Sequence, residues 1–91
     1  MPPGVRDNTA LSRFELDVNG VTAVANYKLD GKVMTFTHTE TPEETRGAGI
    51  ASRLIEVALQ AVRMRGLKIV PRCSFVRAYL EKHPEFQDLL A

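Results

Sequence analysis

The sequence predicts one α/β domain built on a mixed sheet, in which a three-stranded antiparallel meander leads through a loop to a helix, a fourth strand and a second helix. Three observations predict it. Runs with strand-like composition occupy residues 14–18, 21–29 and 32–39, and Asn-Gly and Asp-Gly separate them, as in strands joined by tight hairpin turns. From residue 50 the apolar residues recur at helical spacing. A short apolar run at residues 67–70 then precedes a second helical pattern.

The first twelve residues contain Pro2, Pro3 and Gly4 and show no regular period. We therefore expect a flexible lead-in over residues 1–12, followed by a single domain over residues 13–91. A chain of 91 residues has room for one core but not for a second domain.

The two hairpin turns predict the register of the meander. Two-residue turns at Asn19-Gly20 and Asp30-Gly31 align the flanking strands residue by residue. The predicted pairs are Val18 with Val21, Leu16 with Ala23, Phe14 with Ala25, Leu29 with Lys32, Tyr27 with Met34 and Ala25 with Phe36. This register gathers one apolar face, made of Phe14, Leu16, Val18, Ala23, Ala25, Tyr27, Met34 and Phe36.

A long amphipathic helix is predicted from Ile50 to about Arg65, with Gly66 ending it. Its predicted buried stripe consists of Ile50, Leu54, Ile55, Val57, Ala58, Leu59, Ala61 and Val62. Its solvated stripe consists of Arg53, Glu56, Gln60 and Arg63. Residues 67–70 then form a strand parallel to the strand at 32–39, because a right-handed crossover returns the chain to the same sheet.

The remaining residues predict a second helix and a short terminal turn. Pro71 stops the strand, and Ser74 is a plausible N-cap for a helix over residues 75–83. The side chains expected to face the core are Phe75, Val76, Tyr79 and Leu80. Pro84 begins a last turn or helix over residues 85–90.

Composition limits the class of partner. The chain is 44% hydrophobic and 25% charged with a net charge of +1, so bulk electrostatics favour neither nucleic acid nor a membrane surface. It contains no apolar run near the roughly 20 residues that a membrane span needs. One cysteine, Cys73, cannot form an internal disulfide and fits a reducing compartment. We expect a cytoplasmic monomer.

A glycine-containing loop opens the long helix and reads Arg46-Gly47-Ala48-Gly49-Ile50-Ala51. Glycines let the backbone turn tightly and approach a ligand closely. Unpaired amides at a helix N-terminus carry the positive end of the dipole, so they suit a phosphate. The alternative is a loop that merely enters a helix.

These residues resemble the signature of the GNAT-type N-acetyltransferases, Arg/Gln-x-x-Gly-x-Gly/Ala, which here is Arg46-x-x-Gly49-x-Ala51. The resemblance covers nearly the whole chain and extends to the small single-domain GNAT-like group. The segments that carry it, in order, are His38-Thr39-Glu40, Arg46-Gly47, Pro71-x-Cys73-x-Phe75-Val76 and His83-Pro84-Glu85.

The resemblance implies a GNAT-like mixed sheet whose parallel pair splays apart, and acetyl-CoA as co-substrate. The pantetheine arm would enter the splay and bond backbone near Thr39, Glu40 and Thr41. The pyrophosphate would rest on the amides of residues 46–51, which are Arg46, Gly47, Ala48, Gly49, Ile50 and Ala51.

The chain departs from typical family members in two places. It goes straight from the lead-in into a hairpin, without the pair of helices that shapes the acceptor site, so we expect a shallow acceptor pocket or one completed by a partner. Leu80-Glu81-Lys82 also stands where typical members have Tyr-Glu-Lys. Tyr79 is offset by one residue, about 100° around a helix.

Three residues are candidates for catalysis. Cys73 precedes a helix at a position that favours a thiolate, which could accept an acetyl group or orient the substrate; the alternative is a small buried apolar residue. His38 and Glu40 share a strand face and could take a proton from an attacking amine, or they are an ordinary hydrogen-bonded histidine and a solvated carboxylate. His83 fits a helix cap better than catalysis. Arg53 belongs to the solvated face or reaches a phosphate, and no metal-ligand pattern is present.

The sequence therefore predicts an acetyl-CoA-dependent N-acyltransferase acting on an unidentified small-molecule or protein amine. One alternative is a non-catalytic module that binds acyl-CoA as a sensor or carrier. The other is a plain interaction domain, in which the glycine loop is only a turn.

Overall fold

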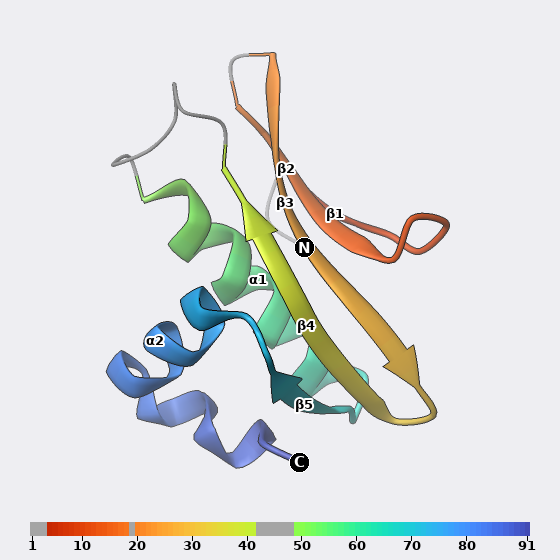
Figure 1. The fold of residues 1–91 in the computed structure, drawn as a ribbon, viewed down its shortest axis with the longest axis vertical. Helices are drawn as coiled ribbons and strands as arrows, with labels where there is room; N and C mark the ends of the chain where they lie inside the picture. Colours follow the sequence, from red (N-terminus) through yellow and green to blue (C-terminus); the bar gives the residue numbers. More distant parts are fainter. Residues whose placement is uncertain (1–3, 19, 42–48) are drawn as a thin grey trace.

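The computed structural model describes residues 4–18, 20–41 and 49–91. In these ranges the strands are β1 (Val5–Asn8), β2 (Arg13–Val18), β3 (Val21–Asp30), β4 (Val33–Glu40) and β5 (Lys68–Pro71). The helices are α1 (Ile50–Met64), α2 (Ser74–Lys82) and the 3₁₀ helix η2 (Pro84–Leu89). Figure 1 shows these elements along the chain.

The strands form one sheet in the order β1-β2-β3-β4-β5. Neighbours from β1 to β4 are antiparallel, and β5 joins β4 in parallel. The predicted mixed sheet, with a meander followed by a parallel pair, is confirmed (Figure 1).

The expectation of an irregular lead-in is wrong for residues 5–8, which form the edge strand β1. Val5 pairs with Leu16 and is buried. Asp7, two residues along on the same face, also holds the strand, since it accepts hydrogen bonds from the Tyr27 hydroxyl at 2.6 Å and from Arg65 at 3.0 Å. The sequence offers only one apolar residue in this strand, so periodicity could not reveal it.

The first hairpin has the predicted register, with Val18 opposite Val21; Asn19 of its turn lies outside the described residues. The second hairpin is shifted by two residues. Leu29 pairs with Met34 and not with Lys32, because Asp30 pairs with Val33 and the loop consists of Gly31 and Lys32. Gly31 adopts a φ of 60°, which suits glycine. A shift of two keeps every side chain on its predicted face.

The register of β3 and β4 changes again further along. Tyr27 pairs with Phe36 but Asn26 pairs with His38, which leaves Thr37 as an extra residue on β4. The hairpin shift already overturns the predicted pairs of Tyr27 with Met34 and Ala25 with Phe36, and the bulge then places Ala25 opposite Thr39. The extra residue exchanges the faces beyond it, so Thr39 joins Phe36 on the core face.

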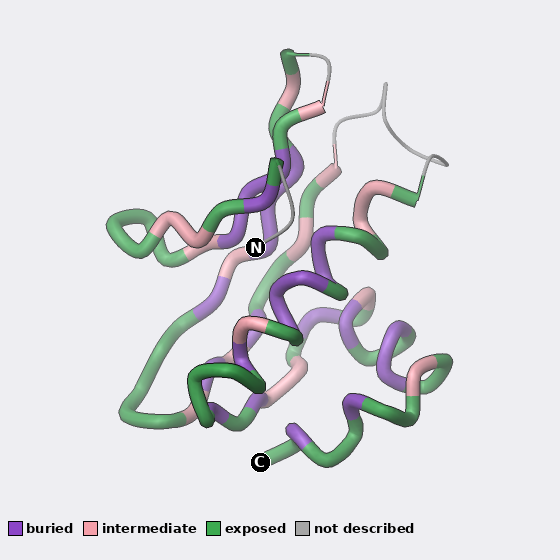
Figure 2. Tube along the Cα trace, turned by 180° about the vertical axis from the view of Figure 1, so that it is seen from behind, coloured by how far each residue is buried: buried purple, intermediate pink, exposed green. Residues whose placement is uncertain are grey.

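Helix α1 lies across one face of the sheet, as views from the front and from behind agree (Figures 1 and 2). Its buried residues all belong to the predicted stripe and are Leu54, Ile55, Val57, Ala58, Leu59 and Val62. Arg53, Glu56, Gln60 and Arg63 are exposed, as expected. Gly66, with a φ of 69°, follows the end of the helix.

Helix α2 contacts β4, β5 and α1, and its residues Val76, Tyr79 and Leu80 are buried in the common core. The predicted N-cap is wrong by one residue: Cys73 occupies the cap position, and Ser74 is the first helical residue.

The terminal helix η2 is held by Arg63, which forms an ion pair with Asp88 at 2.8 Å. No helix within the described ranges is long and apolar enough to cross a membrane.

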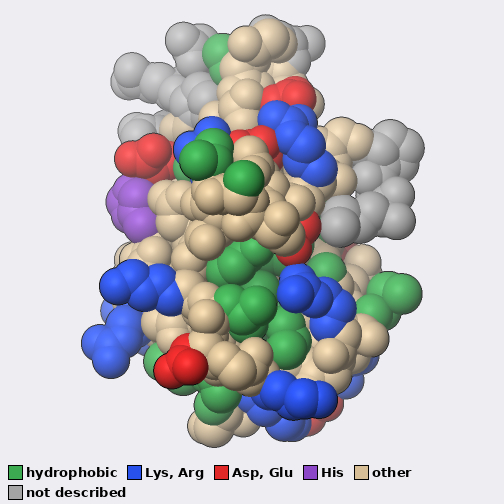
Figure 3. All heavy atoms as spheres, turned by 90° about the vertical axis from the view of Figure 1, so that its right-hand side faces the viewer, with side chains coloured by type: hydrophobic (Ala, Val, Ile, Leu, Met, Phe, Trp, Pro, Cys, Tyr) green, Lys and Arg blue, Asp and Glu red, His purple; other side chains and the backbone are tan. Residues whose placement is uncertain are grey.

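The sheet face opposite α1 carries a cluster of charged residues near β1, centred on one buried carboxylate. Glu15 is only 3% exposed and pairs with Arg6 and Arg13. The hydrogen bond from Arg13 acts against burial and, with Asn8 and Arg6, holds the pKa of Glu15 below its ordinary value. On the side of the molecule drawn in Figure 3, acidic side chains lie among the lysines and arginines, so charges of both signs are interspersed there.

Candidate functional site

Strands β4 and β5 separate at their C-terminal ends. Their pairing stops at Phe36 and Pro71. The Phe36 carbonyl accepts the last two bonds, from the amides of Arg72 and Cys73, each at 3.0 Å. Strand β4 nevertheless continues to Glu40, paired only with β3 among the described strands. The stretch from Thr37 to Glu40 therefore presents a backbone edge that can bond a ligand. This is the separation that the sequence resemblance implied.

Gly49 is the N-cap of α1 and has a φ of 72°. A glycine has no side chain with which to cap the first amides, and the first turn of α1 contains no acidic residue. A Cβ built on Gly49 would meet no atom of the described residues within 4 Å. Among the described residues, no side chain caps the amides of Ile50 and Ala51, and amides at a helix N-terminus suit an anion. Arg46, Gly47 and Ala48, predicted to share this role, lie outside the described residues, as does the stretch 42–45 before them.

Cys73 lies at the end of β5, where the chain turns into α2, and is 8% exposed. Its Sγ is 3.3 Å from Thr39 Oγ1, on the part of β4 that pairs with β3 but no longer with β5. Burial acts to raise the pKa of the Cys73 thiol. The Thr39 hydroxyl and the backbone amides of Val76, Phe75 and Thr39 outweigh it, so the pKa lies below its ordinary value.

His38 and Glu40 share a face of β4, as predicted, and are exposed. His38 Nε2 lies 3.2 Å from Glu40 Oε1. Strand alternation places this pair on the sheet face opposite Thr39, and the bulge at Thr37 makes that face the one opposite Phe36. The structure therefore brings Thr39 and Cys73 together, and His38 and Glu40 together, on opposite sides of the same strand end.

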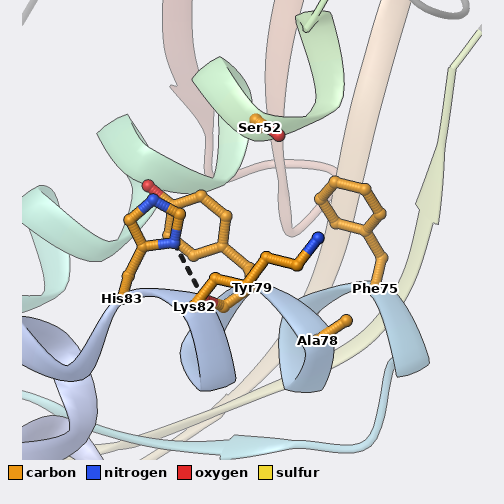
Figure 4. A pocket seen from close by; sticks show the side chains of 6 residues that line it. All are labelled: Ser52, Phe75, Ala78, Tyr79, Lys82 and His83. Carbon is orange, nitrogen blue, oxygen red and sulfur yellow. Dashed lines mark hydrogen bonds between the residues drawn. The ribbon is translucent and has the colours of Figure 1, made fainter.

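A groove of about 110 Å³ lies between α1 and α2. Figure 4 shows its lining, which is Ser52, Phe75, Ala78, Tyr79, Lys82 and His83. Ser52 belongs to the first turn of α1, so the groove begins beside the open helix N-terminus. Its aromatic walls and the Lys82 amino group can accommodate a flat ring and an anion. No motif or period in the sequence indicates this groove, because its residues come from two helices that meet only in the fold.

Tyr79 faces this groove. Its ring stacks on His83 with centroids 3.8 Å apart, and His83 Nδ1 lies 2.9 Å from the Tyr79 carbonyl oxygen, which matches the helix-end position predicted for His83. Burial, aided by Glu56 and Glu85, raises the pKa of Tyr79. Six residues of helix, about 9 Å of rise, separate Tyr79 from Cys73. The phenol is therefore held among groove residues and not beside the thiol.

The fold and the site together define a class of protein. A family model described as GCN5-related N-acetyl-transferase matches residues 13–89, and the chain belongs to this family. Family membership supports N-acetyltransferase activity in general, and acetyl-CoA is the co-substrate that the family generally uses.

Individual relatives agree with this assignment. The protein NATD1 of mouse is 33% identical over 86 residues, which cover 91% of this chain and 78% of the mouse protein. NATD1 of zebrafish is 32% identical over 80 residues, which cover 85% and 73% of the two chains. The solution structure of a GCN5-like protein from Staphylococcus aureus superposes with a TM-score of 0.68 at 25% identity, over all of this chain and 91% of that one.

Proposed function

We propose that the protein is an acetyl-CoA-dependent N-acyltransferase that transfers an acetyl group to an amine. The observation that carries this proposal is the position of the Cys73 thiol, which faces Thr39 on the part of β4 that has lost its β5 partner. Acetyl-CoA lying along that edge would bring its thioester to the sulfur.

The described residues fit the parts of acetyl-CoA. The amide groups of the pantetheine arm would bond the backbone of Thr39, Glu40 and Thr41. The pyrophosphate would rest on the α1 N-terminus at Gly49, Ile50 and Ala51, where no side chain of the described residues caps the helix. The groove that starts at Ser52 would receive the adenosine end.

The chain's own groups can carry the acetyl transfer in two steps. The Cys73 thiolate attacks the thioester carbonyl, the bond from carbon to the CoA sulfur breaks, and the CoA thiolate takes a proton and leaves. An amine then attacks the S-acetyl group, which forms the amide and returns the Cys73 thiolate. The proton from the amine passes to the pair of His38 and Glu40, directly or through water.

A second candidate function is a module that binds acyl-CoA without transferring the acyl group. The position of Tyr79 favours it, since the phenol stacks on His83 and does not stand beside Cys73 to protonate a leaving thiolate.

Mass spectrometry of the protein with acetyl-CoA and a panel of amines tests both candidates. Transfer predicts acetylated amines and, without an amine, one acetyl mass on the single cysteine. Binding of acetyl-CoA with neither product would favour the second candidate. Absence of both binding and products would leave only a plain interaction domain.

A further inference from the structure

The bulge in β4 has a direct effect on the candidate nucleophile. Without an extra residue at Thr37, strict alternation would place Thr39 on the face opposite Phe36. With the extra residue, Thr39 lies on the core face, on which Phe36 is fully buried. The Thr39 hydroxyl lies 3.3 Å from Cys73 Sγ. A hydroxyl is thus directed at the thiol by the same irregularity that turns His38 and Glu40 away.

The protonation state of Cys73 decides which of the two groups donates the hydrogen bond. With a neutral thiol, either group can be the donor. A thiolate only accepts, so the Thr39 hydroxyl must donate to it, and a hydrogen bond to a charged acceptor is roughly twice as strong as one between neutral groups. Cys73 is buried, so few water molecules can replace this donor. Loss of the hydroxyl therefore penalises the thiolate more than the thiol.

We propose that Thr39 is a positioning residue that acts through Cys73, holding Sγ at the opening between β4 and β5 and stabilising its thiolate. The proposal rests on the proposed function in so far as that function uses this thiolate.

In the described structure, the charged groups near Cys73 do not stabilise its thiolate in the way that the Thr39 hydroxyl does. On the same loop and helix, Arg72 and Arg77 are exposed, and Arg77 donates to the carbonyls of Pro71 and Arg72. On β4, His38 and Glu40 lie on the opposite face. On α1, Arg53 and Glu56 point to solvent. Among the described side chains, the direct partner of the sulfur is the Thr39 hydroxyl.

The test is the rate at which iodoacetamide alkylates the protein across a pH series, followed by intact mass. Cys73 is the only cysteine, so the whole signal reports on it. The midpoint of the pH profile gives the thiol pKa, and normalising to the high-pH plateau removes differences in access. Neither acetyl-CoA nor an acceptor amine is needed, so the result does not depend on activity.

Thr39→Val removes the hydroxyl at nearly constant volume, and we expect its midpoint to rise by about one pH unit. Thr39→Ser keeps a hydroxyl and should return the midpoint close to wild type. Thr37→Val is the matched control on the same strand: its hydroxyl bonds the Asn26 carbonyl, so the midpoint should not move. Thr39→Ala, also without a hydroxyl, replaces Thr39→Val if circular dichroism shows the latter unfolded.

A wild-type midpoint in both hydroxyl-free variants would overturn the proposal, as would an equal rise in Thr39→Ser. Acetyl transfer gives an independent readout. The deficit of Thr39→Val should be largest near neutral pH and vanish at high pH, and a pH-independent deficit would overturn the positioning role. If wild-type protein transfers no acetyl group yet shows the shifted midpoints, the proposed function fails while the assignment of Thr39 stands.

Discussion

Two glycines at opposite ends of α1 allow a sharp test of the phosphate site. Gly49 precedes the helix with a φ of 72°, and Gly66 follows it with a φ of 69°. A Cβ at either position would meet no atom within 4 Å in the part of the chain that the structure describes. Gly49→Val and Gly66→Val therefore impose almost the same backbone strain without a steric clash, but only Gly49 lies at the helix N-terminus.

The magnitudes follow from that geometry. A β-branched residue in the left-handed region costs about 1–2 kcal/mol, which lowers Tm by about 5–10 °C in a chain of this size. The two variants should lose similar stability. Acetyl-CoA at about 100 times its Kd should stabilise wild type by about 2.7 kcal/mol, a rise in Tm of more than about 10 °C. Gly66→Val should keep this rise, whereas Gly49→Val should lose it.

Thermal unfolding with and without acetyl-CoA measures both quantities in one experiment, and circular dichroism confirms that each variant is folded. If Gly49→Val retains the full ligand-induced rise, the pyrophosphate does not rest on this helix end. If wild type shows no rise at millimolar acetyl-CoA, the site itself is wrong. Equal loss in both variants would mean that strain alone abolishes binding.

Three further outcomes are expected. Cys73→Ala should abolish the acetyl adduct and slow transfer while leaving the Kd for acetyl-CoA within a few-fold; full turnover in this variant would mean direct transfer to the amine. Tyr79→Phe should keep the transfer rate within a few-fold of wild type, since the phenol stacks on His83 away from the thiol. A large loss in kcat would mean that the Tyr79 hydroxyl takes part in the reaction. The lowered pKa of Glu15 contributes stability above its unfolded value, about 4.5, that is lost as pH falls through the folded value. In urea titrations, Glu15→Gln should lose about 2 kcal/mol at pH 7 but decline less than wild type toward pH 3; parallel declines would refute this linkage.

Local patterns were sufficient for most of the architecture. The helical period placed α1 within one residue of its observed bounds, because its apolar stripe and its flanking glycines agree. The register of the second hairpin was not predictable in the same way. Asp30-Gly31 and Gly31-Lys32 both make acceptable two-residue loops, and a shift of two leaves the same faces buried. The pattern of apolar residues in the sequence is therefore the same for both registers and could not show which one forms.

Edge strand β1 and the groove between α1 and α2 illustrate a second kind of difficulty. Strand β1 is defined by partners far along the chain, such as Tyr27 and Arg65 on Asp7. The groove depends on how Ser52 of α1 meets Tyr79 and Lys82 of α2. Neither feature leaves a period or a motif in its own segment, so only the assembled fold reveals it.

The bulge at Thr37 links the fold to the chemistry. Strict alternation along β4 predicts that His38 and Glu40 share one face, and the structure confirms this. It also predicts that they share the face of Phe36, and the structure contradicts this. The extra residue moves Thr39 to the inner face with Cys73 and leaves the pair of His38 and Glu40 on the outer face, exposed. A thioester lying along the unpaired edge of β4 would then have a thiol on one side and a proton acceptor on the other. In the proposed two-step transfer the amine attacks the S-acetyl group only after CoA has left, so the opening that CoA vacates is the route by which the amine's proton would reach His38 and Glu40, directly or through water.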